Sequence, residues 1–181
     1  KLFSILFIGL FIGLVPLDLS AQYTSLENAS NKQKKSYEKA LDLSRQRNYS
    51  QSKFLLLQIL TQDSTFIDAH IQLAYIYYDQ GQFALAERGI ERALAIEPNY
   101  KPILYYQLGL AEWKQDKMVE ANGHFQSYLA TDEGSDRQRK KAQEYIDDSS
   151  FAIEAMANPV PFDPKPLPPS INTESAEYLP C

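Results

Sequence analysis

A 34-residue repeat is the feature that most restricts how this chain can fold. The segment GQFALAERGIERAL at 81–94 aligns with RNYSQSKFLLLQIL at 47–60 and with DKMVEANGHFQSYL at 116–129. Each block follows a second helical pattern, which reads QKKSYEKALDLSRQ, IDAHIQLAYIYYDQ or PILYYQLGLAEWKQ. A period near 34 residues with two helical patterns is typical of stacked helical hairpins. We therefore expect an all-α array of three hairpins.

Small residues recur at matching places in the repeats, where the two helices of a hairpin would cross. A small side chain at a crossing lets two helix axes approach closely. These positions are Ala40, Ala74 and Gly109 on the first helices and Ser52, Ala86 and Ala121 on the second helices. Gly81 and Asp116 indicate turns within hairpins, and Pro98, which lacks a backbone N–H, indicates the end of the second unit.

The repeats resemble the tetratricopeptide (TPR) family, with units at 33–66, 67–100 and 102–135. The resemblance implies a right-handed superhelix of three helical hairpins with a concave groove for protein or peptide partners. The middle unit fits the family pattern best, whereas the third has Tyr128 where a small residue is usual. Terminal units of such arrays are commonly atypical.

An amphipathic pattern at 136–157 predicts a C-terminal capping helix that covers the exposed end of the third hairpin. One stripe of residues recurs at spacings of three and four, which places it on a single helix face. The stripe consists of Ala142, Tyr145, Ile146, Ser149, Ile153 and Met156. Ser135 or Asp136 would cap the start of this helix. A basic cluster on this helix has acidic neighbours, and we interpret it as a solvated helix face. It consists of Arg137, Arg139, Lys140 and Lys141.

The first 21 residues have the layout of a secretory signal peptide. One lysine precedes an apolar run from Leu2 to Leu17, and a short polar segment then ends in small residues, so we expect cleavage after Ala21. The alternative is an uncleaved anchor, although the run is shorter than the ~20 residues that a spanning helix needs. Residues 22–32 would be a lead segment. Export to the periplasm is the expectation.

The composition changes after Asn158. The segment PVPFDPKPLPPS at 159–170 has six prolines in twelve residues, which predicts an extended tail that serves as a semi-rigid spacer. The following INTESAEYLPC is strand-like but has no partner strand in the chain, so we expect 158–181 to be a Pro-rich linker and the start of a truncated domain.

The end of the chain resembles the first blade of a WD40-like (PD40) β-propeller, through Asn172, Glu177, Tyr178 and Pro180. The resemblance implies the TPR module of a larger OmpA-family envelope protein that is associated with the outer membrane and linked to type IX secretion or gliding machinery. Peptidoglycan would then be bound only by a domain missing from this chain. The alternative is a stand-alone periplasmic TPR adaptor that is complete at Cys181.

The sequence offers no pattern for catalysis, a metal or a cofactor. His70 and His124 lack second ligands at suitable spacing, and there is no phosphate-binding glycine loop or nucleophile elbow. The net charge of −5 gives no electrostatic footprint for nucleic acid. We expect neither enzyme activity nor catalytic or metal sites, and no small-molecule cofactor.

The TPR resemblance also implies a binding surface on the first helix of each repeat. The corresponding positions predict a concave, largely aromatic groove formed by Tyr37, Ile71, Tyr75, Tyr78, Tyr106, Leu110 and Trp113. Such a surface favours capture of an extended or helical peptide in the cell envelope through apolar contacts. The alternative is that some of these rings pack between neighbouring helices, most readily those of Tyr37 and Tyr75.

Overall fold

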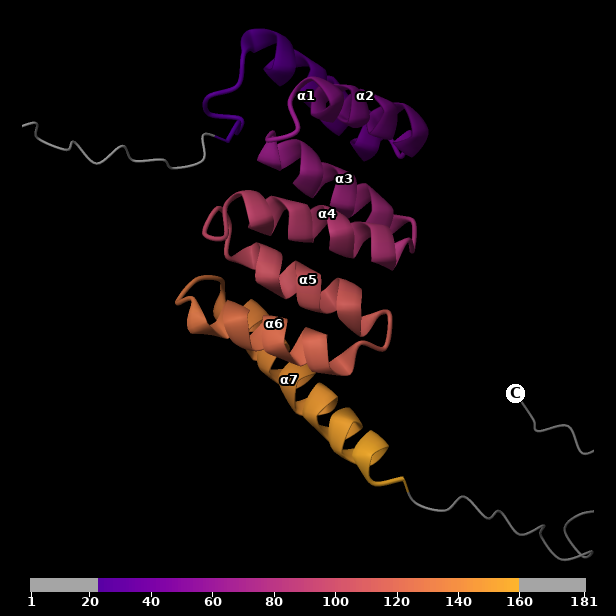
Figure 1. Cartoon of the computed structure of the whole chain (residues 1–181), viewed down its shortest axis with the longest axis vertical. Coiled ribbons are helices and arrows are strands. Elements are labelled where there is room, and N and C mark those ends of the chain that lie inside the picture. Colours follow the sequence, from indigo (N-terminus) through magenta and orange to yellow (C-terminus); the bar gives the residue numbers. More distant parts are fainter. Residues whose placement is uncertain (1–22, 160–181) are drawn as a thin grey trace, which may run out of the picture.

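The computed structural model describes residues 23–159, which form seven helices and no β-strand (Figure 1). The helices are α1 (Asn31–Arg45), α2 (Tyr49–Gln62), α3 (Ile67–Asp79), α4 (Phe83–Ile96), α5 (Ile103–Trp113), α6 (Met118–Ala130) and α7 (Asp136–Ala157). The expected signal peptide, and the Pro-rich tail with its propeller-like end from residue 160 onward, lie outside the described residues.

Consecutive helices pair into three hairpins that stack in chain order. Helices α1 and α2, α3 and α4, and α5 and α6 form the hairpins, while α7 packs against α6 (Figure 1). Each hairpin also contacts the next one through its second helix. The described residues therefore have the fold that the repeat pattern predicts, an array of helical hairpins closed by one further helix.

The three hairpin turns share one backbone conformation. Arg47, Gly81 and Asp116 hold equivalent places in the repeats and have φ angles of 59°, 71° and 59°. In each turn this residue and the next donate their N–H groups to carbonyl oxygens at the end of the first helix. Only the second repeat has glycine there, the residue for which a positive φ carries no steric penalty.

Close approach at the helix crossings depends on the predicted small residues. The side chains of Ala40, Ser52, Ala74, Ala86 and Ala121 are completely buried. In the first hairpin the Ser52 hydroxyl donates a hydrogen bond of 2.7 Å to the Ala40 carbonyl oxygen, which joins the two helices where they cross. The crossing residue is therefore small in every hairpin, and in the first it also satisfies a buried polar group.

Two glycines bring side chains of a neighbouring helix into direct contact with the helix backbone. A Cβ atom at Gly109 would lie 2.9 Å from the Phe125 ring, and one at Gly89 would lie 2.8 Å from the Cβ atom of Ala74. The sequence pattern identified Gly109 but not Gly89, because only the second repeat has glycine at that position. The second hairpin is thus tightly packed along two successive turns of α4.

The unusual Tyr128 of the third repeat is fully buried, and a glycine makes room for it. A Cβ atom at Gly134, whose φ is 91°, would overlap the Tyr128 hydroxyl group. The loop between α6 and α7 therefore passes over the end of the ring. The large side chain is compatible with the fold because glycine at position 134 leaves space for the hydroxyl group of Tyr128.

Helix α7 covers the third hairpin as far as Ser149 and Ser150, which Asn122 of α6 contacts, and projects beyond it with its last turns (Figure 1). Ser135 caps the helix in a capping box with Gln138. Of the predicted stripe, Ala142 and Ser149 are buried, but Met156 is 73% exposed, so the stripe contacts the array over only part of its length. None of the helices in residues 23–159 combines the length and apolar character needed to span a bilayer.

The close contact at Gly89 leads to a prediction about stability. We expect Gly89→Ala to lower the free energy of unfolding by about 1–3 kcal/mol, because an added methyl group would overpack the crossing with Ala74. Gly123→Ala is the matched control, since its Cβ atom would meet no heavy atom within 4 Å. That control should gain about 0.5–1 kcal/mol from helix propensity. Urea denaturation of both variants measures the difference, and equal shifts would contradict the packing argument.

Candidate binding groove

The seven predicted groove residues fall into three groups in the structure. Tyr37 and Ile71 belong to the core, with only 6% and 4% of their surface exposed. The Tyr37 ring packs on Phe66 with 5.7 Å between ring centroids, and its burial raises the pKa of the Tyr37 hydroxyl. These two side chains offer no surface to a partner, which corrects the expectation for the start of the groove.

The chain's own N-terminal segment helps to bury this region. The Ile67 N–H donates to the Thr24 carbonyl oxygen at 2.9 Å, so residues before α1 lie alongside the start of α3. Leu26 packs against the buried cluster that contains Tyr37 and Phe66, and the Tyr23 and Tyr100 rings meet edge to face at a centroid distance of 5.8 Å. The N-terminal segment therefore covers the start of the predicted groove, where a partner was expected to bind.

Asp68 holds this segment in place. It is 2% exposed and accepts three hydrogen bonds, from the Leu26 N–H at 2.9 Å, the Tyr100 hydroxyl at 2.7 Å and the Lys101 ammonium at 2.8 Å. Burial together with the bond to Asp68 raises the pKa of Tyr100. Asp68 thus ties the N-terminal segment, α3 and the link between α4 and α5 together.

Tyr106 and Trp113 form the second group and pack against the capping helix. The ring of Tyr145 on α7 lies 6.4 Å from that of Tyr106 and 5.2 Å from that of Trp113, measured between centroids. Tyr106 also contacts Phe125 and Tyr128 of α6. The packing interpretation therefore applies to these two residues, although both remain partly exposed.

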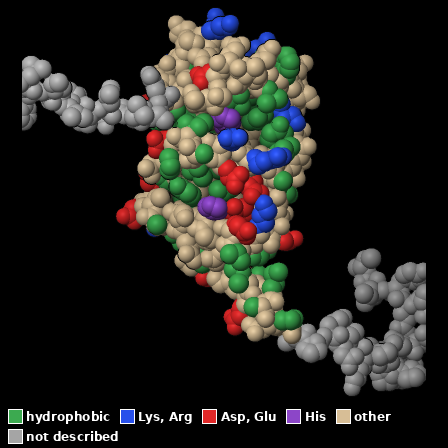
Figure 2. Space-filling view, in the orientation of Figure 1, with side chains coloured by type: hydrophobic (Ala, Val, Ile, Leu, Met, Phe, Trp, Pro, Cys, Tyr) green, Lys and Arg blue, Asp and Glu red, His purple; other side chains and the backbone are tan. Residues whose placement is uncertain are grey.

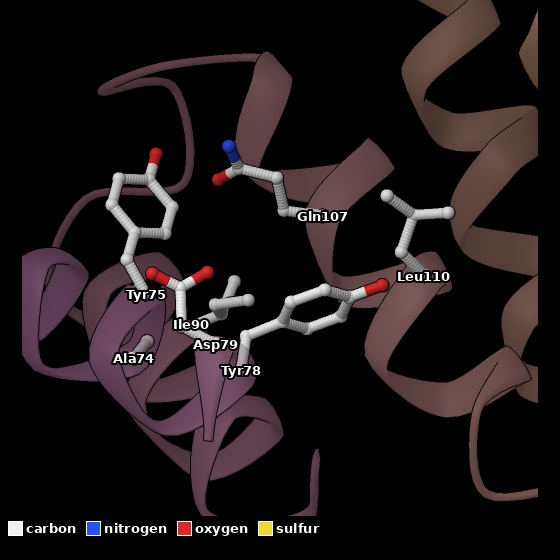
Figure 3. Close-up of a pocket in the computed structure, with 7 residues that line it drawn as sticks. All are labelled: Ala74, Tyr75, Tyr78, Asp79, Ile90, Gln107 and Leu110. Atoms are coloured by element: carbon white, nitrogen blue, oxygen red, sulfur yellow. The ribbon is translucent and has the colours of Figure 1, made fainter. Parts of the chain in front are cut away.

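Tyr75, Tyr78 and Leu110 form the third group and line an open pocket between α3 and α5. Its volume is about 200 Å³, and we call it the groove pocket. Its lining residues are Ala74, Tyr75, Tyr78, Asp79, Ile90, Gln107 and Leu110. Figure 3 shows the Tyr78 ring directed from α3 towards Leu110 on α5, with the Gln107 amide directed back towards Tyr75. The buried side chains of Ala74 and Ile90 make its floor apolar.

Polar groups at the groove pocket can take part in hydrogen bonds with a ligand. The Gln107 Oε1 atom is buried and has no hydrogen-bond partner among residues 23–159. Burial raises the pKa of Tyr75, an effect that the nearby Gln107 amide partly offsets, and burial also raises the pKa of Tyr78. Both phenols are therefore neutral at physiological pH and keep a donor as well as an acceptor.

The histidines do not assemble a metal site. A His70 ring nitrogen lies 3.0 Å from the Ser64 carbonyl oxygen, and the His124 Nδ1 atom lies 2.7 Å from Glu112 Oε2. Within the described part of the chain, no three His, Cys, Asp or Glu side chains are grouped as metal ligands would be. Figure 2 shows acidic and basic side chains gathered beside a histidine on the face in view, an arrangement typical of surface ion pairs.

The fold corresponds to that of tetratricopeptide repeat proteins. Residues 67–100, the bounds assigned above to the second repeat, match the family model described as tetratricopeptide repeat. No curated protein matches the chain by sequence. The array of hairpins is therefore of the TPR type, and solved structures support this assignment independently.

Three solved structures illustrate the likeness. The first TPR domain of Spaghetti (RPAP3), bound to the HSP90 peptide SRMEEVD, superposes with a TM-score of 0.61 at 21% identity over 70% of this chain and 96% of that chain. The type III secretion chaperone SycD of Yersinia enterocolitica, in complex with a peptide of the translocator YopD, gives 0.61 at 10% identity over 69% and 97%.

The third is the Sgt2 TPR domain of Aspergillus fumigatus, with a TM-score of 0.59 at 19% identity over 79% of this chain and 95% of that chain. All three identities are too low to transfer a binding site. They show the TPR-like fold, which confirms the fold class predicted from the repeat.

The His124–Glu112 pair predicts how stability depends on pH. The hydrogen bond to Glu112 raises the pKa of His124 above its ordinary value of 6.5, so the protonated ring favours the folded state. This contribution is complete below the ordinary pKa and is lost as pH rises through the raised pKa of the folded protein. We expect Glu112→Gln to cost about 1 kcal/mol more at about pH 5.5 than at about pH 8.5.

Urea denaturation at both pH values measures this difference, and an NMR titration of the His124 ring should show its pKa falling towards the ordinary value in the variant. His70→Gln is a control that removes an imidazole bonded to a backbone carbonyl instead of a carboxylate. An equal loss of stability at both pH values in Glu112→Gln would show that the pair does not carry the effect.

Proposed function

We propose that this chain is a protein-interaction scaffold that binds a peptide segment of a partner protein in the groove pocket. The observation that carries the proposal is an open apolar pocket between two successive first helices, with an unpaired acceptor, Gln107 Oε1, at its wall. An extended peptide supplies both apolar side chains for the floor and backbone N–H donors for such an acceptor.

The size of the groove pocket supports a peptide over a cofactor. Small-molecule sites typically enclose about 300–1,000 Å³ and bury most of their ligand. The groove pocket is smaller, at about 200 Å³, and it is open on one side. It therefore suits one or two side chains of a longer segment that continues along the surface.

The comparisons are consistent with this role. Two of the similar structures, RPAP3 with the HSP90 peptide and SycD with the YopD peptide, hold a peptide of another protein. TPR proteins are typically scaffolds without enzyme activity. By analogy, we infer an interaction role without catalysis, in which the partner is a protein.

The groove can be tested with peptides selected from a random library displayed against the purified protein. We expect selected peptides to bind Leu110→Asp at least about tenfold more weakly, because a carboxylate replaces apolar surface in the groove pocket. Val119→Asp is the matched control, since Val119 is 66% exposed on α6 and does not line the pocket. Fluorescence anisotropy measures affinity, and circular dichroism confirms that the variants remain folded.

Tyr78→Ala is a second variant in case Leu110→Asp unfolds, and it should lower the affinity for the same peptides because a wall of the groove pocket is lost. Peptides that bind Leu110→Asp and Tyr78→Ala as tightly as they bind the original protein would show that the partner surface lies elsewhere.

We further infer that the chain is exported and acts in the cell envelope, as the TPR module of a larger OmpA-family protein of the outer membrane or periplasm. Its links to type IX secretion or gliding machinery rest on the sequence patterns in 1–21 and 158–181 alone. A stand-alone periplasmic TPR adaptor is the second candidate, and the coding sequence after Cys181 separates the two.

Export predicts a specific mature N-terminus. We expect the chain, fused to alkaline phosphatase in a bacterial host, to be recovered from the periplasm in active form with Gln22 as its first residue, because the apolar run would be cleaved after Ala21. Mass spectrometry of the N-terminal peptide and fractionation measure this. A Leu6→Arg, Phe7→Arg double variant is the control that should retain the fusion in the cytoplasm, and cytoplasmic recovery of the original fusion would refute export.

A further inference from the structure

A second hollow lies next to the groove pocket, between α5 and the start of α7. It measures about 600 Å³ and is lined by Tyr106, Arg137, Gln138, Lys140, Lys141 and Glu144. Three of these six residues are cationic and only one is anionic. We call Arg137, Lys140 and Lys141 the basic edge. These cations are exposed, as expected for a solvated helix face, and they also line a concave part of the surface.

The two hollows are adjacent because neighbouring residues of α5 line them. Tyr106 faces the second hollow, whereas Gln107 and Leu110, one and four residues further along α5, face the groove pocket. The Lys141 ammonium lies 5.0 Å from the centre of the Tyr145 ring, and that ring in turn packs against Tyr106. Tyr106 therefore stands between the apolar pocket and the basic edge.

The charges of the basic edge are largely unneutralised. Within residues 23–159, Arg137 and Lys140 make neither an ion pair nor a side-chain hydrogen bond, and Lys141 pairs only with the exposed Glu144, at 2.9 Å. Arg139, on the same helix, instead donates to the carbonyl oxygens of Leu129, Thr131 and Glu133 and thereby has a structural role. Arg137 and Lys140 thus line a concave surface without a direct ion pair, in a chain whose net charge is −5.

We propose that the basic edge binds acidic side chains of the same peptide whose apolar side chain occupies the groove pocket. The partner is therefore an extended segment in which an apolar residue is followed or preceded by a short acidic run. This inference rests on the proposed function, since the groove pocket must bind a peptide at all. The lining carries two positive charges after Glu144 is counted, so it suits more than the single charge of a chain terminus.

The test selects displayed peptides, held internally so that no free C-terminus is present, against the purified original protein and an Arg137→Glu, Lys140→Glu double variant. We expect the original protein to enrich apolar residues next to Asp or Glu. The double variant should bind those peptides about tenfold more weakly and should lose the preference for acids. Arg88→Glu, Arg92→Glu is the matched control, because it reverses two charges beside a surface hollow on α4 and should leave the preference intact.

The outcomes separate this inference from the proposed function. Peptides that require Leu110 but bind both double variants equally would overturn the role of the basic edge and leave the groove intact. The absence of any peptide that depends on Leu110 would overturn both. Amidated peptides with Gln in place of each acid should bind about tenfold more weakly, and full recovery of affinity by a free C-terminus would identify a terminal carboxylate as the ligand and refute the acidic run.

The salt dependence gives an independent readout. Charge pairs at a solvent-exposed edge are screened at high ionic strength, whereas apolar contacts are not. We expect the affinity for an acidic peptide to fall several-fold between about 50 mM and 500 mM salt in the original protein. In the Arg137→Glu, Lys140→Glu variant, whose lining is acidic, the affinity should instead rise with salt because the repulsion is screened. An affinity that is independent of salt in the original protein would contradict the proposal.

Discussion

The close crossing of paired helices is the constraint on which the rest of this structure depends. Ala40 with Ser52, Ala74 with Ala86, and Gly109 with Ala121 let the two helices of each hairpin approach until large neighbours interlock. Because every hairpin has the same crossing, the first helices follow one another at a regular interval. That interval separates Tyr75 and Tyr78 on α3 from Gln107 and Leu110 on α5, so the width of the groove pocket depends on the crossing residues, of which only Ala74 lines the pocket.

The two ends of the array are closed by different means, which leaves the middle open. At the start, residues 23–29 lie beside α3 and are held by Asp68, so Tyr37 and Ile71 become core residues. At the other end, Tyr145 of α7 packs on Tyr106 and Trp113. An unclosed array would expose apolar surface at both ends. The groove pocket between the second and third hairpins is therefore the part of the predicted stripe that remains available.

The sequence predicted what depends on local spacing. Helix pairs, turns and crossings repeat every 34 or 35 residues, so a single chain contains three versions of the same signal, and departures such as Tyr128 stand out against it. The Gly134 that accommodates Tyr128 was not recognised, because nothing in the repeat specifies how the loop into α7 passes over the ring. The repeat pattern thus predicts the fold, but it does not predict a local change such as the loop conformation that accommodates Tyr128.

The site was predicted less completely because it depends on contacts between distant segments. The partners of Asp68 lie 32, 33 and 42 residues away, and the lead segment that contains Leu26 has no periodic pattern. Spacing identifies the face of a helix, whereas the structure decides whether that face meets solvent or another segment. This is why Tyr75, Tyr78 and Leu110 line a pocket while Tyr37, which was predicted on the same stripe, is buried.

Two buried oxygen atoms show why the groove pocket is more than a packing defect. Tyr128 Oη and Gln107 Oε1 both lack a hydrogen-bond partner among residues 23–159, and each such group costs about 1–3 kcal/mol. Tyr128 is completely enclosed beneath the Gly134 loop, so a ligand cannot reach it. Gln107 lines an open pocket, so a turn of its side chain would bring the buried oxygen within reach of a peptide N–H. Of the two oxygens, only that of Gln107 can therefore contribute to the proposed binding, in which a peptide N–H would relieve its cost.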